Sequence, residues 1–366
     1  MNILIIEPYF AGSHKAWAQG YQRHSKHRVE ILSLSGHHWK WRMHGGAVTL
    51  ARKFLTDRLK PDIIVATDML DVSTFLALTR SQTASIPIYL YFHENQITYP
   101  RTTYDKDVKK DRDHHYGWIN FVSALSANRV YFNSRFHLET FYKALPTFLN
   151  QFPDKKEKGQ IEELEKKSKV LLLGMDFTPF LASFPPSVVS DNSPLILWNH
   201  RWEYDKGPEV FFRVLWQLKT QHYSFRLAVL GESYSQQPPV FAQAQKLFKQ
   251  EIIHWGYIES EAEYAKLLFE ADVLPVTSLQ DFFGMSVVEA MYANCIPLVP
   301  TGKVYEEHIP PPERKLLIYK DENDLLEKLK QYLTRPEDFR KLYPQNWVGR
   351  YDWKILAPVY DEELAS

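Results

Sequence analysis

The sequence predicts an α/β fold in which two doubly wound domains each carry a parallel sheet between layers of helices. Short unbroken apolar runs recur along the whole chain, and longer segments with helical spacing separate them. Runs that are apolar at every position are typical of strands buried on both faces of a parallel sheet. The length of 366 residues favours two domains over one or three.

The first half of the chain alternates strands and helices. The expected strands are 3–6, 29–32, 63–66, 88–92 and 130–132. Helical segments lie between them, for example 48–59, which Pro61 ends, and 118–127. This alternation predicts a first doubly wound domain over 1–180.

The alternation stops at 151–169, where lysines and glutamates follow one another without an apolar stripe. The composition favours a solvated helix or a mobile insertion. A linker between the domains is predicted next, from Gly174 through a stretch that contains Pro179, Pro185, Pro186 and Pro194.

The second half repeats the pattern and predicts a second doubly wound domain over 181–350. Its expected strands are 195–198, 226–230, 252–255, 273–276 and 296–299. Helices are expected at 208–219 and 261–269. A last helix in 351–366 is expected to pack back on the first domain. Two such domains that face each other place a cleft at the carboxyl ends of both sheets.

Charge and cysteine content exclude several classes of protein. Lys+Arg and Asp+Glu number 44 each, which is unlike a nucleic-acid coat or a membrane-surface protein. The single cysteine, Cys295, allows no intrachain disulfide and lies in an apolar run, so we expect a buried, inert thiol. Residues 1–10 lack the features of a signal peptide or a transmembrane helix. We therefore expect an untargeted cytoplasmic protein without a membrane partner.

Residues 1–60 are the most basic part of the chain, with ten Lys+Arg and three Asp+Glu. This excess could attract a polyanion, or the basic residues could be spread over separate helix faces. Within this region, 37–44 interleaves Trp39 and Trp41 with Lys40 and Arg42. That mixture suits stacking on unpaired bases, and a packing loop is the alternative. Its histidines lack zinc-site partners, so we predict no metal.

The segment 277–291 follows a predicted strand and enters a helix. Backbone N–H groups around 283–285 would open at the helix start, where they favour a negatively charged or polyhydroxyl ligand. Asp281 lies in the loop and Glu289 lies eight residues later inside the helix, so both could face one ligand. Two acids at this spacing carry little weight without their context.

The segment 199–208 lies between a strand and a helix, and Pro208 suits the first position of that helix. Arg201 and Lys206 then converge on the cleft. An arginine fork and a lysine charge are what a diphosphate leaving group needs, because negative charge grows on its oxygens as the bond breaks. Two surface cations beside neighbouring carboxylates are an equal alternative.

Further candidates follow strands of the first half. Gly12 comes after the first strand, where the backbone could approach a phosphate. His93 and the residues 94–96 follow the strand 88–92, and Asn133 closes the next strand. Ligands bind at this carboxyl edge in such sheets. For His93, a satisfied core histidine is the alternative.

Taken in order, these segments resemble the retaining family-4 glycosyltransferases, which have the GT-B fold. The resemblance rests on Arg201 with Lys206–Gly207, on Asp281–Glu289 with Phe283–Gly284 inside it, and on Gly174–Asp176. More narrowly, the chain resembles the tRNA-queuosine mannosyltransferase family, also described as the glycosyltransferase-like domain-containing family. The segments that carry this resemblance are 3–7, 12–15, 39–42, 91–96 and 132–134.

The resemblance implies transfer of mannose from GDP-mannose, with retention, to the cyclopentenediol of queuosine at the wobble position of a tRNA, without a metal or other cofactor. The catalytic residues implied are His93, Arg201, Lys206 and Asp281. The donor-binding residues are Gly12, Arg201, Lys206, Tyr257, Ile258, Asp281, Phe283, Gly284, Met285 and Glu289. The tRNA-binding residues expected are His14, Lys15, Trp39, Trp41, Arg42, Glu94, Asn95, Gln96 and Asn133.

Two other functions stay open. One is a family-4 glycosyltransferase with another nucleotide sugar and a saccharide, lipid or protein acceptor. Asp281 stands where many such enzymes have Glu, and this difference leaves the identity of the transferred sugar open. The other is a non-catalytic tRNA-binding protein with a degenerate sugar site, against which Arg201, Lys206 and Glu289 together argue. A nicotinamide enzyme would need Gly-x-Gly-x-x-Gly after a strand, and the sequence has none.

Overall fold

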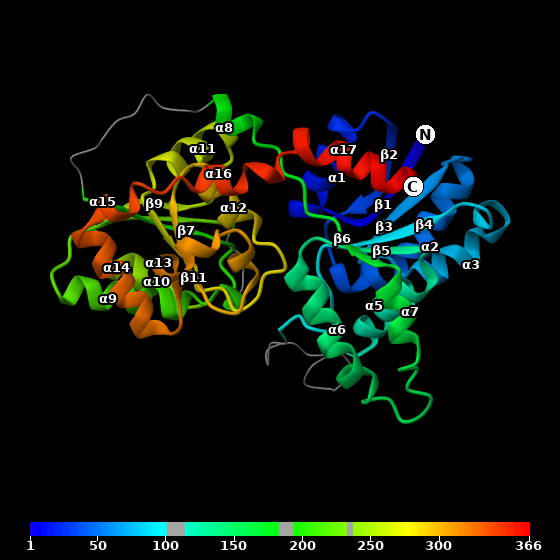
Figure 1. Cartoon of the computed structure of the whole chain (residues 1–366), viewed down its shortest axis with the longest axis horizontal. Coiled ribbons are helices and arrows are strands. Elements are labelled where there is room, and N and C mark those ends of the chain that lie inside the picture. Colours follow the sequence, from blue (N-terminus) through cyan, green and yellow to red (C-terminus); the bar gives the residue numbers. More distant parts are fainter. Residues whose placement is uncertain (101–113, 183–192, 233–236) are drawn as a thin grey trace. The chain divides into compact units, whose positions relative to one another are not determined.

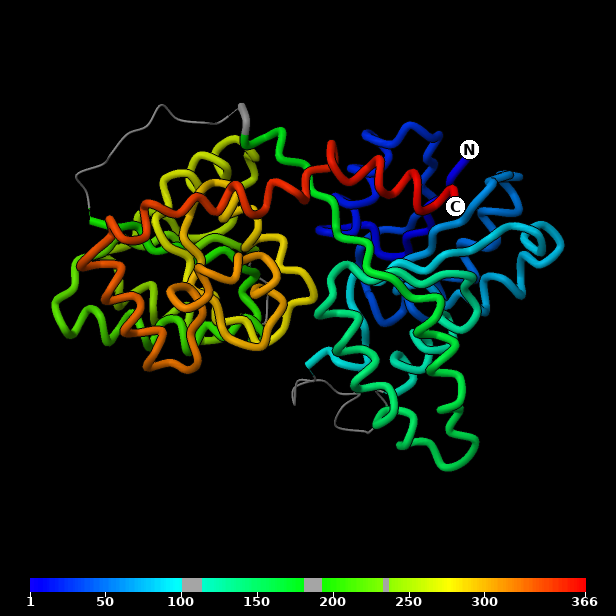
Figure 2. The backbone as a smooth tube through the Cα atoms, viewed as in Figure 1, coloured from blue at the N-terminus to red at the C-terminus, as the bar shows by residue number. Residues whose placement is uncertain are grey.

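The computed structural model describes residues 1–100, 114–182, 193–232 and 237–366 (Figure 1). The chain divides into two compact units. Unit 1 comprises Met1–Asp176 and Tyr351–Ser366, and unit 2 comprises Phe177–Arg350. Each unit is a parallel sheet with helices on both faces, as the sequence predicts (Figures 1 and 2). None of the helices that the structure describes is long and apolar enough to cross a membrane.

The sheet of unit 1 has the strand order β2-β1-β3-β4-β5-β6, with parallel pairing throughout. Its strands are β1 (Asn2–Phe10), β2 (Arg28–Ser35), β3 (Ile63–Thr67), β4 (Ile88–Phe92), β5 (Arg129–Phe132) and β6 (Ser168–Val170). The five predicted strands are confirmed. The edge strand β6 was not predicted, because Ser168 and Lys169 interrupt any apolar run there.

Helices cover the two faces of this sheet. The helices are α1 (Gly12–His24), α2 (Trp39–Thr56), α3 (Val72–Thr83), α5 (His114–Ser126), α6 (Arg135–Leu149), α7 (Gln160–Lys166) and α17 (Trp353–Ala365). One face packs Ile64, Leu90 and Phe132 in the main core with residues of α2, α3, α5 and α6. Successive strand residues point to opposite faces, so Val65, Tyr91 and Tyr131 lie on the other face, under α1 and α17.

The helix α2 begins at Trp39, well before the predicted start at residue 48. Two adjacent glycines, Gly45 and Gly46, lie inside it and weaken the helical signal in the sequence. Gly46 faces β1, where a β-carbon would lie 3.3 Å from the Cβ of Pro8. The glycine therefore allows close packing of this helix on the sheet.

The charged segment 151–169 contains α7, in which Leu164 is buried, Gln160 and Ile161 are partly buried and the other residues are exposed. Leu164 is fully buried and belongs to the main core of unit 1. The prediction of a solvated helix is therefore confirmed for Gln160–Lys166, with Ile161 and Leu164 as apolar contacts to the core.

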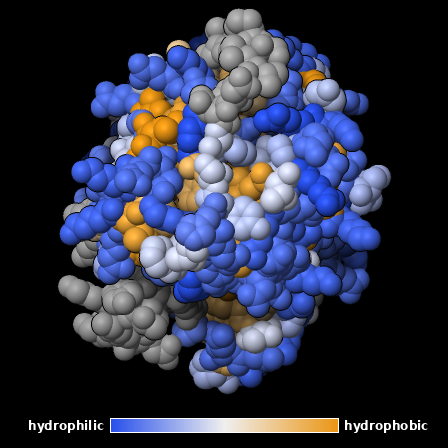
Figure 3. Space-filling model, turned by 90° about the vertical axis from the view of Figure 1, so that its left-hand side faces the viewer, coloured by the Kyte–Doolittle hydropathy of each residue, from blue (hydrophilic) through white to orange (hydrophobic). Residues whose placement is uncertain are grey.

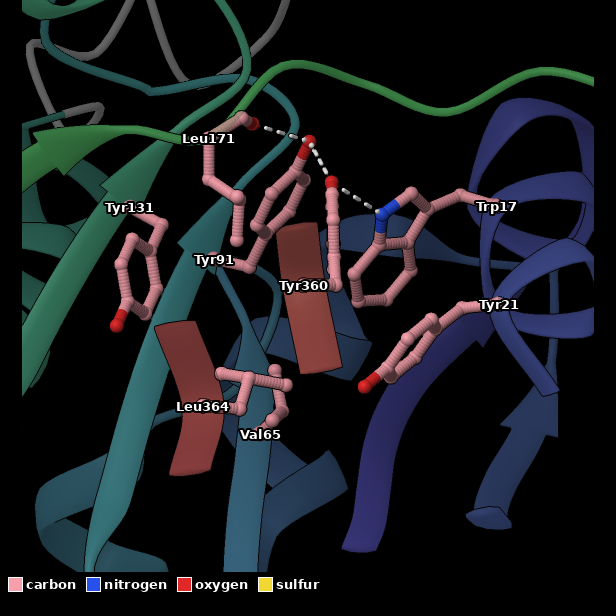
Figure 4. A pocket seen from close by; sticks show the side chains of 8 residues that line it. All are labelled: Trp17, Tyr21, Val65, Tyr91, Tyr131, Leu171, Tyr360 and Leu364. Carbon is pink, nitrogen blue, oxygen red and sulfur yellow. Dashed lines mark hydrogen bonds between the residues drawn. The ribbon is translucent and has the colours of Figure 1, made fainter. Parts of the chain in front are cut away.

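The C-terminal helix α17 belongs to unit 1 and packs on α1. The indole N–H of Trp17 donates to the hydroxyl of Tyr360 at 3.1 Å, and the hydroxyl of Tyr21 donates to Asp361 at 2.8 Å. Figure 4 shows the rings of Trp17, Tyr21, Tyr91 and Tyr360 gathered on the sheet, with the Tyr91 and Tyr360 hydroxyls facing each other. The described side chains of this cluster leave no space for a water molecule.

The sheet of unit 2 has the strand order β12-β11-β10-β7-β8-β9, again with parallel pairing. Its strands are β7 (Leu195–Asn199), β8 (Arg226–Leu230), β9 (Ile252–Gly256), β10 (Val273–Pro275), β11 (Ile296–Pro300) and β12 (Ile318–Tyr319). The five predicted strands are confirmed, and β12 is a two-residue edge strand that the sequence did not reveal. Cys295, just before β11, is buried as predicted.

The longer helices of unit 2 are α9 (Pro208–Thr220), α10 (Val240–Leu247), α11 (Glu261–Glu270), α12 (Met285–Tyr292) and α14 (Glu322–Thr334). Short helices are α8 (Thr178–Ala182), α13 (Arg314–Leu317), α15 (Pro336–Phe339) and α16 (Pro344–Val348). Of the predicted linker, Pro179 lies in α8, whereas Pro185 and Pro186 lie outside the described residues. The face shown in Figure 3 is mostly hydrophilic, with separate small apolar patches.

Candidate functional site

In unit 1, polar side chains meet at the carboxyl ends of neighbouring strands. The strand order changes direction between β1 and β3, which is the position where sheets of this kind bind ligands. Glu7 lies on β1, Asp68 follows β3, His93 follows β4 and Asn133 follows β5. The sequence predicted His93 and Asn133 here. Glu7 and Asp68 were missed as candidates, and their position at strand ends was the only signal.

Glu7 and His14 form a buried ion pair. The Nδ1 of His14 lies 2.9 Å from the Oε2 of Glu7, and both residues are buried. The other oxygen of Glu7 accepts the backbone N–H of Tyr9 at 2.7 Å. Burial opposes protonation of His14, but the Glu7 carboxylate outweighs it and raises the pKa of His14 to about 9. His14, expected among the tRNA-binding residues, therefore lies inside unit 1 as a charged partner of Glu7.

The ring of His93 is packed among three other rings. Its centroid lies 4.2 Å from that of His14 and 4.9 Å from those of Trp17 and Tyr91. Both ring nitrogens are buried and have no hydrogen-bond partner among the residues that the structure describes. Burial, together with the charge of His14, holds the pKa of His93 well below its usual value. His93 is thus a neutral imidazole, and its two ring nitrogens are able to form hydrogen bonds to a ligand.

Asp68 fixes the backbone that follows β4. Its Oδ1 accepts the N–H of His93 at 2.7 Å, and its own carbonyl accepts from the side chain of Asn120 at 2.9 Å. The Oδ1 of Asn120 accepts the N–H of Gln96 at 2.8 Å. Burial raises the pKa of Asp68 to about 8; His14 opposes this rise, whereas Glu94 and Glu7 add to it.

Three of the expected acceptor residues, Glu94, Asn95 and Gln96, form the turn after β4. Asn95 is fully buried, and its Oδ1 accepts the N–H groups of Ile97 and Thr98 at 3.1 and 2.9 Å. The Nε2 of Gln96 donates to Glu94 at 2.9 Å. Asn95 therefore shapes the turn, and Glu94 and Gln96 are the more accessible members of this segment.

Gly12 begins α1 directly after β1, with φ of +48°. No described atom lies within 4 Å of the place where its β-carbon would be, so the start of this helix is open. Lys15, one turn on, is exposed, and its Nζ lies 6.0 Å from the ring centre of Phe10. An open helix N-terminus with a nearby lysine suits an anionic ligand, as expected for this turn.

Residues 39–44 of the Trp-rich segment 37–44 are the start of the helix α2, whereas the sequence suggested a loop. Trp39 packs on Tyr116 with a centroid distance of 5.2 Å. Trp41 is 64% exposed, and Arg42 donates to the Ser35 carbonyl at 3.1 Å. The two tryptophans therefore differ: Trp39 packs inside unit 1, and Trp41 is accessible to solvent.

In unit 2, two segments of the sequence meet at the carboxyl ends of β7 and β10, where the strand order changes direction. The hydroxyl of Thr277 donates to the carbonyl of Lys206 at 2.9 Å, and the N–H of Leu279 donates to the carbonyl of Asp205 at 2.7 Å. The structure thus brings the two predicted motifs together.

Lys206 is buried at the centre of this arrangement. Its Nζ lies 3.0 Å from Asp281 Oδ1, 3.0 Å from Asp205 Oδ2 and 3.3 Å from the carbonyl of Gln280. Burial opposes its charge, but the two aspartates outweigh burial and raise its pKa. A diphosphate would therefore compete with Asp281 for this ammonium group.

Asp281 is held on both oxygens, by Lys206 and by the hydroxyl of Tyr305. Burial works against its ionisation, yet Lys206 and His200 hold its pKa below the usual value. Arg201 lies on the outside of the same loop, with a side chain that is 48% exposed and lies 3.2 Å from Glu203. Arg201 is thus the more accessible of the two predicted cations.

The helix α12 begins at Met285, directly after Gly284, as predicted. Gly284 has φ of +82°, and a β-carbon there would lie 2.7 Å from the ring of Tyr305. The preceding carbonyl, that of Phe283, lies 2.8 Å from His308 Nε2. The turn before this helix is therefore fixed on both sides.

Glu289 lies in α12 and accepts a hydrogen bond from the hydroxyl of Tyr264 at 2.7 Å. That hydroxyl also accepts from the side chain of Asn199 at 2.8 Å. Burial raises the pKa of Glu289 to about 7. Tyr257, which follows β9, is 65% exposed, and Ile258 beside it is partly buried.

Among the described residues, one group of three side chains brings potential metal-ligating atoms within 4.8 Å of one another: Glu7, His14 and His93. Two of these atoms bond each other at 2.9 Å, so an ion pair explains their approach. The prediction that no metal is needed stays a prediction.

Two family models match the chain. Residues 2–175 match the model described as tRNA-queuosine alpha-mannosyltransferase N-terminal, and residues 181–346 match Glycosyl transferases group 1. A relative from Drosophila melanogaster, named tRNA-queuosine alpha-mannosyltransferase, is 32% identical over 370 residues, which cover 98% of this chain and 95% of the relative.

Solved structures share the fold. Anabaena Alr3699/HepE in complex with UDP has a TM-score of 0.67 and 14% identity, with 100% of both chains covered. Sucrose-phosphate synthase from Thermosynechococcus elongatus has a TM-score of 0.71 and 14% identity, covering 100% of this chain and 99% of that one. The fold is the GT-B fold of glycosyltransferases, and the full-length identity to the Drosophila relative shows that the chain belongs to the tRNA-queuosine alpha-mannosyltransferase family.

Proposed function

We propose that the protein transfers mannose from GDP-mannose, with retention, to the cyclopentenediol of queuosine at the wobble position of a cytoplasmic tRNA, without a metal. The observation that carries this proposal is the match of nearly the whole chain to a relative of that name, with both halves matched by family models. The wobble base of an anticodon loop is already unpaired, so it can be reached without melting a duplex.

The donor site of the proposal lies in unit 2. Arg201 and Lys206 neutralise the diphosphate, and Glu289 binds the ribose hydroxyls. Asp281 and the backbone of 283–285 bind the sugar, and Tyr257 and Ile258 contact the base. The support is that the two motifs meet at the switch point of this sheet, where such folds bind nucleotides.

The acceptor site of the proposal lies in unit 1. His93 hydrogen-bonds a hydroxyl at the reacting centre, and Gly12 approaches the phosphate with its backbone. Glu94, Gln96 and Asn133 shape the surroundings of the acceptor. Lys15, Trp41 and Arg42 contact the tRNA. The support is that both ring nitrogens of His93 are buried without a partner in the described part of the chain.

In the proposed reaction the acceptor hydroxyl attacks the sugar C1 on the face that the diphosphate leaves. The bond between C1 and the phosphate oxygen breaks, the bond between C1 and the acceptor oxygen forms, and the hydroxyl proton passes to the departing diphosphate. Arg201 stabilises the charge that grows on the leaving group, and such preorganised contacts are typically worth about 10²- to 10³-fold in rate.

A mass measurement tests the proposal. Purified protein is incubated with queuosine-containing tRNA and, separately, with GDP-mannose, GDP-glucose, UDP-glucose and UDP-galactose. The tRNA is then digested and its nucleosides are weighed. A hexose on queuosine with GDP-mannose alone is the expected result, and tRNA that carries guanine in place of queuosine is the control.

The other outcomes are equally informative. Addition of a hexose from a different donor would support queuosine as the acceptor and would contradict mannose as the transferred sugar. Binding or hydrolysis of a nucleotide sugar without addition to the tRNA would overturn the acceptor.

A further inference from the structure

A buried ion pair lies against the histidine that the proposed function places at the reacting centre. Glu7 and His14 bond at 2.9 Å, and the ring of His14 lies 4.2 Å from that of His93. We infer that Glu7 and His14 are positioning residues, which hold a positively charged imidazole against His93 and so keep His93 a neutral hydrogen-bonding partner for a substrate hydroxyl. The identity of that hydroxyl rests on the proposed function.

The ring of His93 is fixed before any substrate binds. The backbone N–H of His93 donates to Asp68 Oδ1 at 2.7 Å, and the backbone carbonyl of His93 accepts from the Asn133 side chain at 2.9 Å. The backbone of His93 is therefore held on both sides. The rings of Trp17 and Tyr91 enclose the imidazole at 4.9 Å. Both rings belong to the aromatic cluster of Figure 4, which hydrogen bonds to Tyr360 of α17 tie together. A group held in this way needs little reorganisation when it binds a substrate.

The fixed ring offers polar atoms that the protein itself does not use. Neither ring nitrogen of His93 bonds a described residue, although both are buried. Leaving buried polar atoms without partners destabilises a fold, and such atoms are typical of sites where a ligand supplies the missing bonds. A neutral imidazole supplies one donor and one acceptor, which is the complement of a hydroxyl group.

The charges around His93 come from several elements. The titratable groups that face it or act on its neighbours are Glu7 of β1, His14 of α1, Asp68 after β3, Tyr91 of β4, Glu94 after β4 and His137 of α6. Burial holds the pKa of His137 well below its usual value, so that residue adds no charge at neutral pH. The cation next to the ring of His93 is therefore His14, which owes its charge to Glu7.

This arrangement has a functional consequence. Protonated His93 would carry two donors and no acceptor, and could not accept a hydrogen bond from a hydroxyl. Burial is the first cause that opposes protonation of His93. The adjacent imidazolium of His14 adds to it, because the two like charges would lie about 4 Å apart in a buried site. Glu7 thus acts on His93 through His14, without a contact of its own to the substrate.

Glu7→Gln tests the inference, because it keeps the size of the side chain and removes the charge. Histidine side chains are labelled with ¹⁵N in the full-length protein and titrated by NMR, with His14→Phe and His93→Gln used to assign the two resonances. In the wild type we expect His14 to be protonated and His93 to be neutral at pH 7. In Glu7→Gln we expect His14 to be neutral at pH 7 and the pKa of His93 to rise toward its usual value.

The second measurement is the pH profile of turnover, made with the donor and acceptor that the mass experiment identifies. The acid limb should move to higher pH in Glu7→Gln, because His93 then gains a proton more readily. Glu7→Asp, which keeps the charge, should restore most of the wild-type profile. If Glu7→Gln does not fold, His14→Phe keeps the ring contact without the charge and should show the same upward shift.

Asp361→Asn is the matched control. Asp361 is also a buried carboxylate of unit 1, but its partners are Tyr21, Ser25 and the backbone of Lys26. This variant should leave the His93 titration unchanged. The inference is overturned if Glu7→Gln leaves the His93 titration as in the wild type, or if it lowers turnover equally at every pH. Because the titration needs no substrate, it stands even if the proposed donor or acceptor is wrong.

Discussion

Gly207 and Thr277 approach so closely that a β-carbon on residue 207 would lie 2.3 Å from the Thr277 carbonyl oxygen. Gly207 also has φ of +67°, in the left-handed region that favours glycine. This contact joins the loop of Lys206 to the loop of Asp281, and the hydrogen bond from Thr277 to the Lys206 carbonyl lies beside it. The proposed donor site therefore depends on Gly207, a residue without a side chain.

Gly207→Ala should destabilise unit 2 and weaken donor binding together. The left-handed conformation alone costs an alanine about 1–2 kcal/mol, and the contact with the Thr277 carbonyl adds to that. Gly302→Ala is the matched control, because Gly302 has φ of +71° with no described atom within 4 Å of a β-carbon. Calorimetry should show a larger loss of stability for Gly207→Ala. Equal losses for the two variants would contradict the importance of the contact.

Arg201→Ala should lower turnover by about 10²- to 10³-fold without a change in melting temperature. Its side chain is 48% exposed, so its removal leaves no buried charge behind. Arg213→Ala is the control, since Arg213 is an exposed arginine of the same unit that pairs with Glu322. Near-normal turnover of Arg201→Ala would show that the diphosphate is stabilised elsewhere.

The strands could be predicted from the sequence because burial on both faces leaves an unbroken apolar run. Ile88–Phe92 is buried at all five positions, and its bounds were predicted correctly. The edge strands β6 and β12 were missed because they are short, and Ser168 and Lys169 in β6 are polar. The start of α2 was missed because its two glycines hide the helical pattern.

Candidate residues could be named from the sequence where they share a short segment or follow a predicted strand. Arg201, Lys206, Asp281 and Glu289 stand in two short segments, and their role in donor binding stays a prediction. The contact of Lys206 with Asp281 was not foreseen, because it depends on the pairing of β7 with β10. The ion pair beside His93 likewise joins a strand end to a helix, which no local pattern reveals.

Donor binding should weaken as the pH falls through 7. The pKa of Glu289 is raised to about 7 by burial, so the carboxyl group loses its proton near neutral pH. The carboxylate can accept hydrogen bonds from two ribose hydroxyls at once, and these charge-assisted bonds are stronger than those to the neutral acid. Deprotonation is complete at high pH, and we expect the dissociation constant of GDP-mannose to rise about ten-fold from pH 8 to pH 6. Calorimetric titration at each pH measures it.

Glu289→Gln should bind GDP-mannose more weakly and with little pH dependence, because the amide does not titrate. His200 is not responsible over this range, since burial lowers its pKa to about 4. A pH dependence that survives in Glu289→Gln would have to come from another group, such as Asp68, whose pKa is raised to about 8.

Trp41→Ala should weaken tRNA binding and leave donor binding and stability unchanged. Trp41 is 64% exposed, and stacking of a base on an aromatic ring contributes about 1–3 kcal/mol, which corresponds to about 5- to 150-fold in affinity. Trp216→Ala is the control, since Trp216 is a 44% exposed tryptophan of unit 2. Filter binding with queuosine-containing tRNA measures the effect. An equal loss of tRNA affinity in both variants would show that Trp41 has no specific role in the proposed acceptor site.

Removal of metal ions should leave turnover unchanged. In the proposed reaction Arg201 and Lys206 neutralise the diphosphate, and Glu7 and His14 bond each other directly at 2.9 Å. Protein dialysed against EDTA and assayed in metal-free buffer should therefore match untreated protein. If activity is lost and Zn²⁺ restores it, and if His93→Gln abolishes the bound zinc, the three side chains hold a metal. In that case His14 ligates the ion as a neutral imidazole, and its positive charge cannot be what keeps His93 neutral.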